Sequence, residues 1–171
     1  MKTTTKIYGI ALVLTCGLAT TLRAQNLYIA SYYNGTIGEY TTAGATVNVD
    51  LISGMNGPWG ITISGNDLFV SNEGSGTIGE YTTAGATVNA DLISGLDGPT
   101  GIAISGNDLF ISNAGNGTIG EYTTAGATVN ADLISGLDNP TGIAVAPVPE
   151  PSTMALGGLG SLALCMWRHR S

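Results

Sequence analysis

The sequence predicts an all-β protein of three four-stranded antiparallel sheets, and three observations support this. A 41-residue unit recurs three times, in residues 25–65, 66–106 and 107–147. The last two copies share 34 of 41 residues, and the first shares 27 of 41 with the second. Each unit contains four short runs of strand-forming residues separated by turn signals. A period of about 40 residues with four strands per unit is typical of propeller blades.

The central copy justifies the strands in order. Its first two runs, 67–72 and 77–82, are separated by the sequence EGSG, and TAGA separates the second from the third at 87–93. In the third run Val88, Ala90 and Leu92 alternate with polar Asn89 and Asp91 and with Ile93, the period of a half-exposed strand. The fourth run is 101–105, with Ile102 and Ile104.

Turn residues connect these strands. Gly106-Asn107 predicts a tight turn from one copy into the next. The outer copies carry Asn34-Gly35 and Asn116-Gly117, a dipeptide that favours two-residue hairpins because both positions accept positive φ. We therefore expect antiparallel hairpins throughout residues 25–147.

A family resemblance fits this pattern. Residues 99–104 (PTGIAI), 106–113 (GNDLFISN) and 118–122 (TIGEY) resemble the repeats of NHL and related TolB-like six-bladed β-propellers. Residues 119–126 (IGEYTTAG) are also similar to streptogramin-lyase-like propellers. The resemblance covers residues 26–146 and implies the architecture more than any activity, because one fold serves many functions.

In the register that this resemblance implies, the Gly-Ile-x-Ile run is the innermost strand of each blade. The chain then begins out of phase: residues 27–52 supply the second to fourth strands of a blade, and residues 141–146 supply a first strand without its blade. We expect twelve strands, divided three plus one across the two ends.

Three blades are too few for a ring, because propellers have about four to eight. Two chains joined head to tail would form a six-bladed homodimer, with each C-terminal strand completing the partner's first blade. The alternatives are an open arc of three blades, or a fragment of a formerly longer protein. An open arc would expose edge strands, which favour edge-to-edge assembly.

The N-terminus has the pattern of a secretory signal peptide, predicted as a helix over residues 1–24. Two lysines lie within the first six residues, an apolar run follows at 7–19, and Ala24 occupies the expected cleavage position. Cys16 lies inside that run, but no small residue directly precedes it, so Sec export is favoured over lipoprotein processing. The repeats contain no cysteine and thus no disulfide framework.

Charge is partitioned along the chain. All five basic residues and His169 lie outside residues 25–147, whereas eleven of the twelve acidic residues lie inside. This body of charge −11 excludes nucleic-acid binding, which depends on Lys and Arg at the phosphates. An acidic body stays soluble and attracts cations.

The C-terminal region, 148–171, combines three features. A proline-rich linker ends in Val148, Pro149, Glu150, Pro151 and Ser152, an uncharged run over 153–167 predicts a transmembrane helix, and Arg168 and Arg170 form a basic membrane stop. That helix would span about 22 Å of a hydrocarbon core about 30 Å thick, which makes it a marginal anchor. The basic end should remain cytoplasmic, with the repeats outside. An ordinary anchor behind a proline linker is the alternative interpretation.

Together these features resemble the PEP-CTERM sorting signal, which is also known as an ice-binding protein C-terminal motif. The resemblance implies a Gram-negative bacterial protein that passes signal peptidase and is recognised by an exosortase at Pro149-Glu150-Pro151. It implies cleavage near that motif and release to the envelope, surface or extracellular matrix. The ice-binding label concerns the tail alone and is no argument for ice binding.

Catalytic groups are scarce in the body, which has no Cys, Lys or His to provide an activated nucleophile or base. Lyase chemistry of the streptogramin type, as the resemblance implies it, depends on histidine, and His169 lies in the tail. Repetition places the acids in equivalent environments, whereas a glycosidase needs two that differ. The lactonase-like metal site of related propellers has no asymmetric counterpart here. The acids repeat as Glu39, Glu80 and Glu121, as Asp50, Asp91 and Asp132, and as Asp67 and Asp108.

Two groups of residues remain as binding candidates. A ring of Glu39, Glu80 and Glu121 could hold a cation such as calcium through oxygen ligands, although solvated blade rims are the favoured interpretation. Tyr40, Tyr81 and Tyr122 also repeat, which favours packing between blades. Tyr32, Tyr33 and Trp59 do not repeat, so they form a candidate aromatic surface, for carbohydrate or simply to cover an edge.

The sequence therefore favours a secreted, non-enzymatic propeller-type repeat protein, without a cofactor, that serves as a binding or structural component of the cell surface or exopolysaccharide matrix. Its partner would be a polysaccharide or a surface protein. The alternative is a propeller-superfamily hydrolase or lyase, lactonase-like and assembled across a dimer.

Overall fold

The computed structural model describes residues 25–146, which form eleven β-strands. The strands of the first sheet are β1 (Asn26–Ser31), β2 (Thr36–Thr41) and β3 (Thr46–Ile52). Those of the second are β4 (Pro58–Ser64), β5 (Asp67–Asn72), β6 (Thr77–Thr82) and β7 (Thr87–Ile93). Those of the third are β8 (Pro99–Ser105), β9 (Asp108–Asn113), β10 (Thr118–Thr123) and β11 (Thr128–Ile134). The predicted strand runs are confirmed, and the fourth of them begins at Pro99 instead of Gly101.

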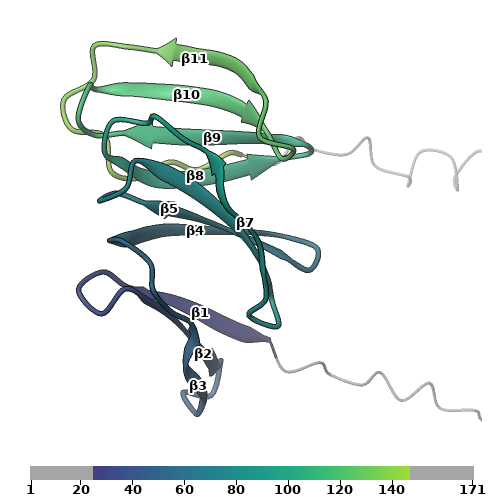
Figure 1. Cartoon of the computed structure of the whole chain (residues 1–171). Coiled ribbons are helices and arrows are strands. Elements are labelled where there is room, and N and C mark those ends of the chain that lie inside the picture. Colours follow the sequence, from purple (N-terminus) through teal and green to yellow (C-terminus); the bar gives the residue numbers. More distant parts are fainter. Residues whose placement is uncertain (1–24, 147–171) are drawn as a thin grey trace, which may run out of the picture.

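Each sheet is an antiparallel meander in chain order (Figure 1). The first sheet has three strands, β1-β2-β3, and the other two have four. Within residues 25–146, the first sheet therefore lacks the strand that β4 and β8 supply to the others. The predicted strand register is confirmed, because β1, β2 and β3 correspond to the second, third and fourth strands of the following sheets.

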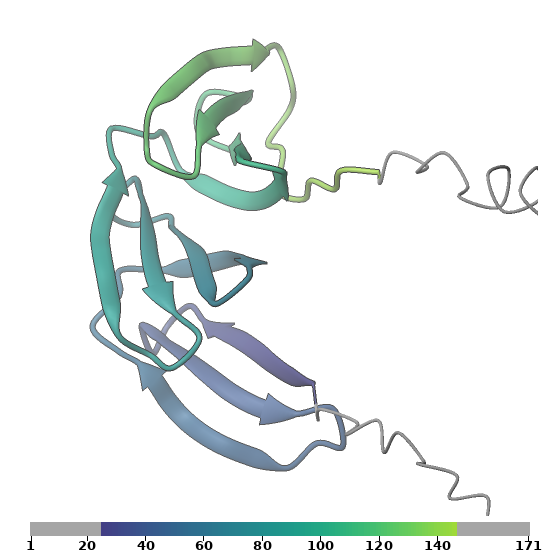
Figure 2. The same cartoon turned by 90° about the vertical axis from the view of Figure 1, so that its right-hand side faces the viewer.

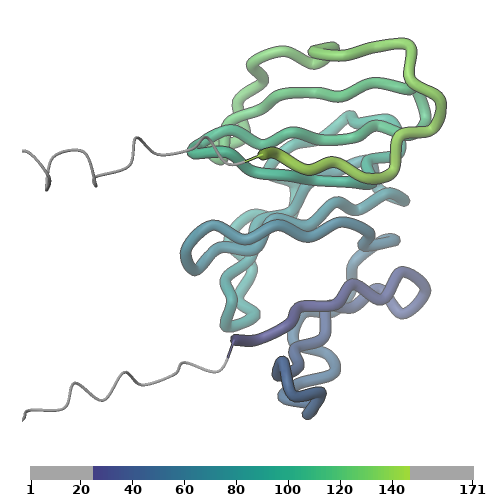
Figure 3. Tube along the Cα trace, turned by 180° about the vertical axis from the view of Figure 1, so that it is seen from behind, coloured from purple at the N-terminus to yellow at the C-terminus, as the bar shows by residue number. Residues whose placement is uncertain are grey.

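The sheets fan out in an open arc (Figure 2). Strands β4 and β8 are in contact with each other, as are β1 and β4, so the inner strands line one side of the arc. The segment before Ala146 runs alongside the third sheet (Figure 3). There Thr100 Oγ1 donates a hydrogen bond to the carbonyl of Pro140 at 2.9 Å. This segment thus lies beside β8 as β8 lies beside β4.

Residues 141–146 depart from the prediction. They are extended but pair with no strand among residues 25–146, so this part of the chain has eleven strands where twelve were predicted. A strand requires a hydrogen-bonded neighbour, and the sheet that would supply one is the one missing after β11.

Two local predictions are also wrong. The Asn34-Gly35 and Asn116-Gly117 pairs lie in four-residue connections between strands, and only Gly35 and Gly117, at φ 65° and 69°, adopt positive φ. Strand β7 is exposed along most of its length instead of alternating, and Ile93 is the residue it buries. Strand β7 is the edge strand of its sheet, with β6 as its one neighbour in the described chain, and Ile93 at its C-terminal end packs against the third sheet.

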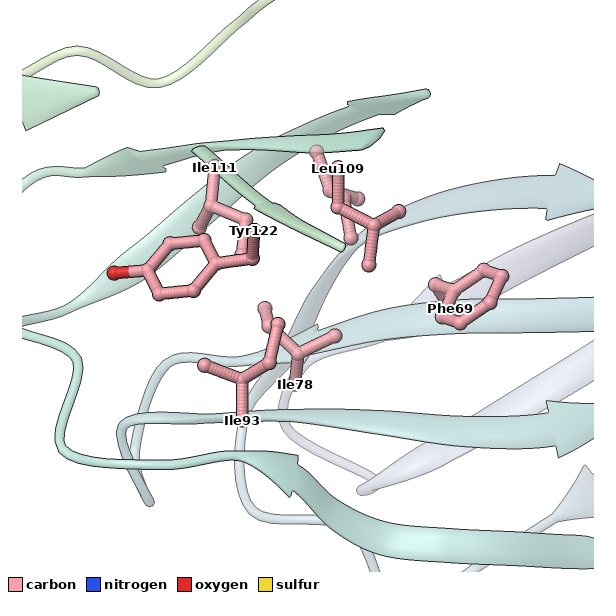
Figure 4. Close-up of a cluster of buried hydrophobic side chains, with 7 residues drawn as sticks. Phe69, Ile78, Ile93, Leu109, Ile111 and Tyr122 are labelled. Carbon is pink, nitrogen blue, oxygen red and sulfur yellow. The ribbon is translucent and has the colours of Figure 1, made fainter. Parts of the chain in front are cut away.

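The core lies between the sheets. Ile37 and Ile52 of the first sheet pack on Leu68, Val70 and Tyr81 of the second. The next junction repeats this contact with Ile78 and Ile93 against Leu109, Ile111 and Tyr122 (Figure 4). Tyr81 and Tyr122 are buried between sheets, which confirms the predicted packing role for these two copies, whereas Tyr40 of the first sheet is half-buried.

Close contact between inner strands depends on a glycine and a serine. The Gly60 amide donates to Ser71 Oγ at 2.8 Å, and that hydroxyl also bonds the carbonyl of Thr100. A Cβ on Gly60 would collide with the same carbonyl. In the third sheet the buried hydroxyl of Ser112 has no such partner among the described residues. The contact between β8 and the terminal segment is therefore looser than that between β4 and β8.

The two predicted terminal helices, over residues 1–24 and 153–167, lie outside the described residues. Within residues 25–146 no helix is long and apolar enough to cross a membrane. The body between those two regions is all-β.

Candidate functional site

The three unrepeated aromatic residues lie together at one end of the arc. Tyr32 and Tyr33 belong to the connection between β1 and β2, and Trp59 is the second residue of β4. The ring centroids of Tyr32 and Tyr33 are 5.1 Å apart, and those of Tyr32 and Trp59 are 5.5 Å apart, both in edge-to-face geometry. The structure thus assembles the predicted residues into one surface, named here the aromatic cluster.

The aromatic cluster faces solvent. Tyr33 is 97% exposed and Trp59 is 48% exposed, although large aromatic side chains are usually well buried. Exposed rings in preset positions favour contact with a ligand, because they supply apolar area without further ordering. Thr100, the repeat equivalent of Trp59, is buried against Pro140. The first copy therefore differs in both chemistry and exposure.

An acidic residue completes the cluster. The hydroxyl of Tyr32 donates a hydrogen bond to the Glu73 carboxylate, which lies in the connection between β5 and β6. This hydrogen bond raises the pKa of Tyr32 above its usual value, and slight desolvation and the negative charge of Glu73 add to the effect. Sequence reasoning missed Glu73. Its signal was the repeat position itself, which holds Tyr32, Glu73 and Ala114 in the three copies.

Two hollows lie between β1 and β4. One, of about 210 Å³, is lined by Ala30, Tyr32, Pro58 and Trp59. The other, of about 480 Å³, has walls that include Leu27, Tyr28 and Ile63. The aromatic cluster therefore borders the first hollow, beside the strand β1, which has no inner strand next to it among residues 25–146. The two hollows together are named here the β1 groove.

The weaker alternative for the repeated glutamates, a cation-binding ring, is not assembled among the described residues. Among residues 25–146, no three His, Cys, Asp or Glu side chains lie close enough to hold a metal ion. Glu39 instead accepts a 2.6 Å hydrogen bond from the side-chain amide of Asn26. At the equivalent place Glu80 faces Asp67, and desolvation, with repulsion from Asp67, raises the pKa of Glu80. Glu39, Glu80 and Glu121 stand on separate sheets.

The sorting and membrane-stop residues, 148–152 with Arg168 and Arg170, lie outside the described residues. Their identification rests on sequence. A family model, the PEP-CTERM protein-sorting motif, matches residues 147–171. The chain carries this motif at its C-terminus, and the motif implies recognition by an exosortase during export and sorting to the cell envelope.

Solved structures agree with the fold. A streptogramin B lyase superposes with a TM-score of 0.58 at 19% identity, over 71% of this chain and 41% of that one. Selenomethionine-substituted virginiamycin B lyase from Staphylococcus aureus also gives 0.58, at 22% identity, over 71% and 42% of the two chains. This chain thus spans less than half the length of these proteins. At such identities the similarity shows a β-propeller fold, and no curated protein matches the sequence.

Proposed function

We propose that this chain, a propeller-type body with a PEP-CTERM sorting motif, is a non-enzymatic polysaccharide-binding component of the cell surface or extracellular matrix. The observation that carries the proposal is the aromatic cluster, which is assembled from unrepeated residues and exposed on an otherwise repetitive body. Apolar rings beside a few polar groups are typical of ligand sites. Glu73, with the carboxylate held by Tyr32, would accept hydrogen bonds from sugar hydroxyls.

Several features support the absence of catalysis and of a cofactor. Residues 25–147 contain no His, Cys, Lys or Arg. Glu39, Glu80 and Glu121 stand on separate sheets, so these repeated carboxylates form no catalytic pair with one another. Binding through aromatic rings and one carboxylate requires neither a nucleophile nor a metal ion.

The tail determines the proposed route. The helix predicted at 153–167 would hold the chain in the inner membrane until an exosortase cleaves near Pro149-Glu150-Pro151, and the body would then pass to the matrix. With these three residues replaced by alanine, we expect the protein to keep its anchor and stay in the membrane fraction. Immunoblots of membrane and external fractions, compared with wild type, check this. Unchanged size and fractionation would contradict exosortase processing.

The binding site is tested with substitutions taken from the repeats themselves. Trp59→Thr and Tyr33→Gly install the residues of the other copies, Thr100 and Gly115, so folding should be preserved. We expect each to weaken binding to a glycan array, and to the host's own exopolysaccharide, by about tenfold, the typical cost of removing a central aromatic contact.

Val129→Ala serves as the control, because Val129 is exposed on the outer strand β11, in another sheet. It should bind as wild type does, with or without calcium. Equal binding by all three variants would show that the aromatic cluster is not the polysaccharide-binding site. Turnover of a sugar lactone or of streptogramin B would instead favour the hydrolase or lyase alternative.

A further inference from the structure

The free face of the first sheet exposes residues that the other copies bury. Leu27 and Ile29 of β1 are 45% and 48% exposed. Their repeat equivalents are fully buried in β5 and β9, as Leu68 and Val70 and as Leu109 and Ile111. Because the residues at these two positions are the same or similar aliphatic types in all three copies, the missing neighbours of β1 account for the difference. These neighbours are an inner strand at its edge and a preceding sheet against its face.

At the opposite end of the arc, the third sheet also exposes a residue that the other copies bury. Ile134 of β11 is 49% exposed, whereas its equivalents Ile52 and Ile93 are each 5% exposed. At both internal junctions this isoleucine packs on the next sheet, whose buried leucine corresponds to Leu27. The exposed faces of the first and third sheets therefore correspond to the two sides of a sheet–sheet contact that the molecule already makes twice.

The terminal segment and the β1 groove match in the same way. Residues 140–146 lie beside β8, held by the bond from Thr100 Oγ1 to the Pro140 carbonyl, but have no strand partner in the described chain. The buried Ser112 hydroxyl is unpartnered there, although its equivalent Ser71 bridges two inner strands. At the other end of the arc, the edge strand β1 has no inner strand beside it among the described residues, whereas the terminal segment is an inner strand without a sheet.

We propose that a second copy of this chain closes the arc, and that residues 140–146 of each copy fill the β1 groove of the other as its missing inner strand. The register follows from β4 and β5, where Ile61 pairs with Val70 and Ile63 with Leu68. By repeat equivalence, Ile143 pairs with Ile29 of the partner subunit, and Val145 pairs with Leu27 of the partner subunit.

Two copies satisfy the geometry. Propellers have about four to eight blades, and six is the only multiple of three in that range. A head-to-tail contact that closes after two chains buries both free faces and leaves no unpaired inner edge. The donated strand ends at Ala146, immediately before the sorting motif at 147–171. Each anchor would therefore leave the ring at a junction.

Closure goes beyond the proposed polysaccharide binding: the donated strand would fill the hollow beside Tyr32 and Trp59, and Tyr33 would be left as the exposed ring for the polysaccharide. Gly74 and Gly115, the equivalents of Tyr33, stay exposed beside complete four-stranded sheets. Tyr33 therefore remains accessible after the strand is added. In the closed dimer the two-fold axis coincides with the central axis of the propeller. Both aromatic clusters therefore lie on the same face of the ring, where one polysaccharide could contact both and gain avidity.

Disulfide trapping tests the register. In the full-length chain with Cys16→Ser and Cys165→Ser, Ile29→Cys and Ile143→Cys would become directly opposed across an antiparallel pair, within disulfide range. Under mild oxidation we expect a covalent dimer, in at least about tenfold higher yield than from the control pair Ile29→Cys and Ala146→Cys. The control is three residues out of register, about 10 Å along the strand.

Mixing separates the outcomes further. Chains with only Ile29→Cys, mixed with chains with only Ile143→Cys, should yield covalent heterodimers. An intrachain disulfide, a ladder of higher species, or equal yields from the two registers would each overturn the proposal. Light scattering on the chain with neither engineered cysteine provides a second readout, and a strict monomer would also overturn it.

Gly142 gives an independent check. A Cβ on Gly60 or Gly101 would meet the carbonyl of the next inner strand, whereas one on Gly142 meets nothing within 4 Å in the single described chain. In the closed ring, Gly142 would face the carbonyl of Trp59 of the partner subunit. Gly142→Ala should therefore raise the dimer dissociation constant by about tenfold or more. An unchanged dissociation constant would contradict closure in this register.

Discussion

Gly60→Ala is expected to lower the free energy of unfolding by about 3 kcal/mol and the melting temperature by about 10 °C. The added methyl group would collide with the Thr100 carbonyl and would crowd Ile102 Cγ2 and Ser71 Oγ, both at 3.1 Å. Backbone atoms cannot move aside like a flexible side chain, so β4 and β8 must separate. Thermal unfolding followed by circular dichroism measures the loss.

The other two glycines at this repeat position are the controls. A Cβ on Gly101 would lie 2.7 Å from the Thr141 carbonyl, but that carbonyl belongs to the unpaired terminal segment, which can shift. Gly101→Ala should therefore cost less than Gly60→Ala. Gly142→Ala should be within about 0.5 kcal/mol of wild type in dilute solution, where chains are separate. Equal losses at all three positions would contradict the open arc.

Leu109→Ala is expected to cost about 2–5 kcal/mol, because it removes a fully buried side chain and leaves a cavity between the second and third sheets. Leu27→Ala, at the same repeat position, should cost less than about 1 kcal/mol in dilute solution, since Leu27 is largely exposed. Chemical denaturation of the two variants compares one substitution in two environments.

Concentration provides the control for this pair. When the protein is concentrated enough for rings to close, Leu27→Ala should begin to destabilise, because Leu27 then lies under the donated strand. The cost of Leu109→Ala should not depend on concentration. A large loss for Leu27→Ala in dilute monomer would show that the same chain already covers the β1 edge, contrary to the structure.

The strands were largely predictable from the sequence. Near-identical copies repeat each turn signal three times, so the runs at 67–72, 77–82 and 87–93 were located with the bounds of β5, β6 and β7. The incomplete first sheet followed from the strand register that the propeller resemblance implies. Local chain chemistry is sufficient for such features, because strand and turn preferences act over a few residues.

Side-chain environments were less predictable. The alternation along 87–93 suggested one buried face, but β7 is an edge strand that is exposed over most of its length, and its last residue, Ile93, packs against the third sheet. The part that Glu73 plays was missed because it depends on Tyr32, 41 residues away in another sheet. Bulges and contacts between sheets depend on neighbours that no local pattern records.

The amino-acid sequence by itself determined three four-strand repeats, their phase, the unrepeated aromatic residues and the sorting motif at 147–171, because each depends on residue order along the chain. Only the tertiary structure decided that Tyr32, Tyr33 and Trp59 meet at one end, and that 141–146 is extended without a partner. The tertiary structure also decided that Leu68 and Leu109 are buried while Leu27, at the same repeat position, is exposed. The physical reason is that burial and pairing belong to neighbouring sheets, and the same residue therefore has a different environment at the end of the arc than in its middle.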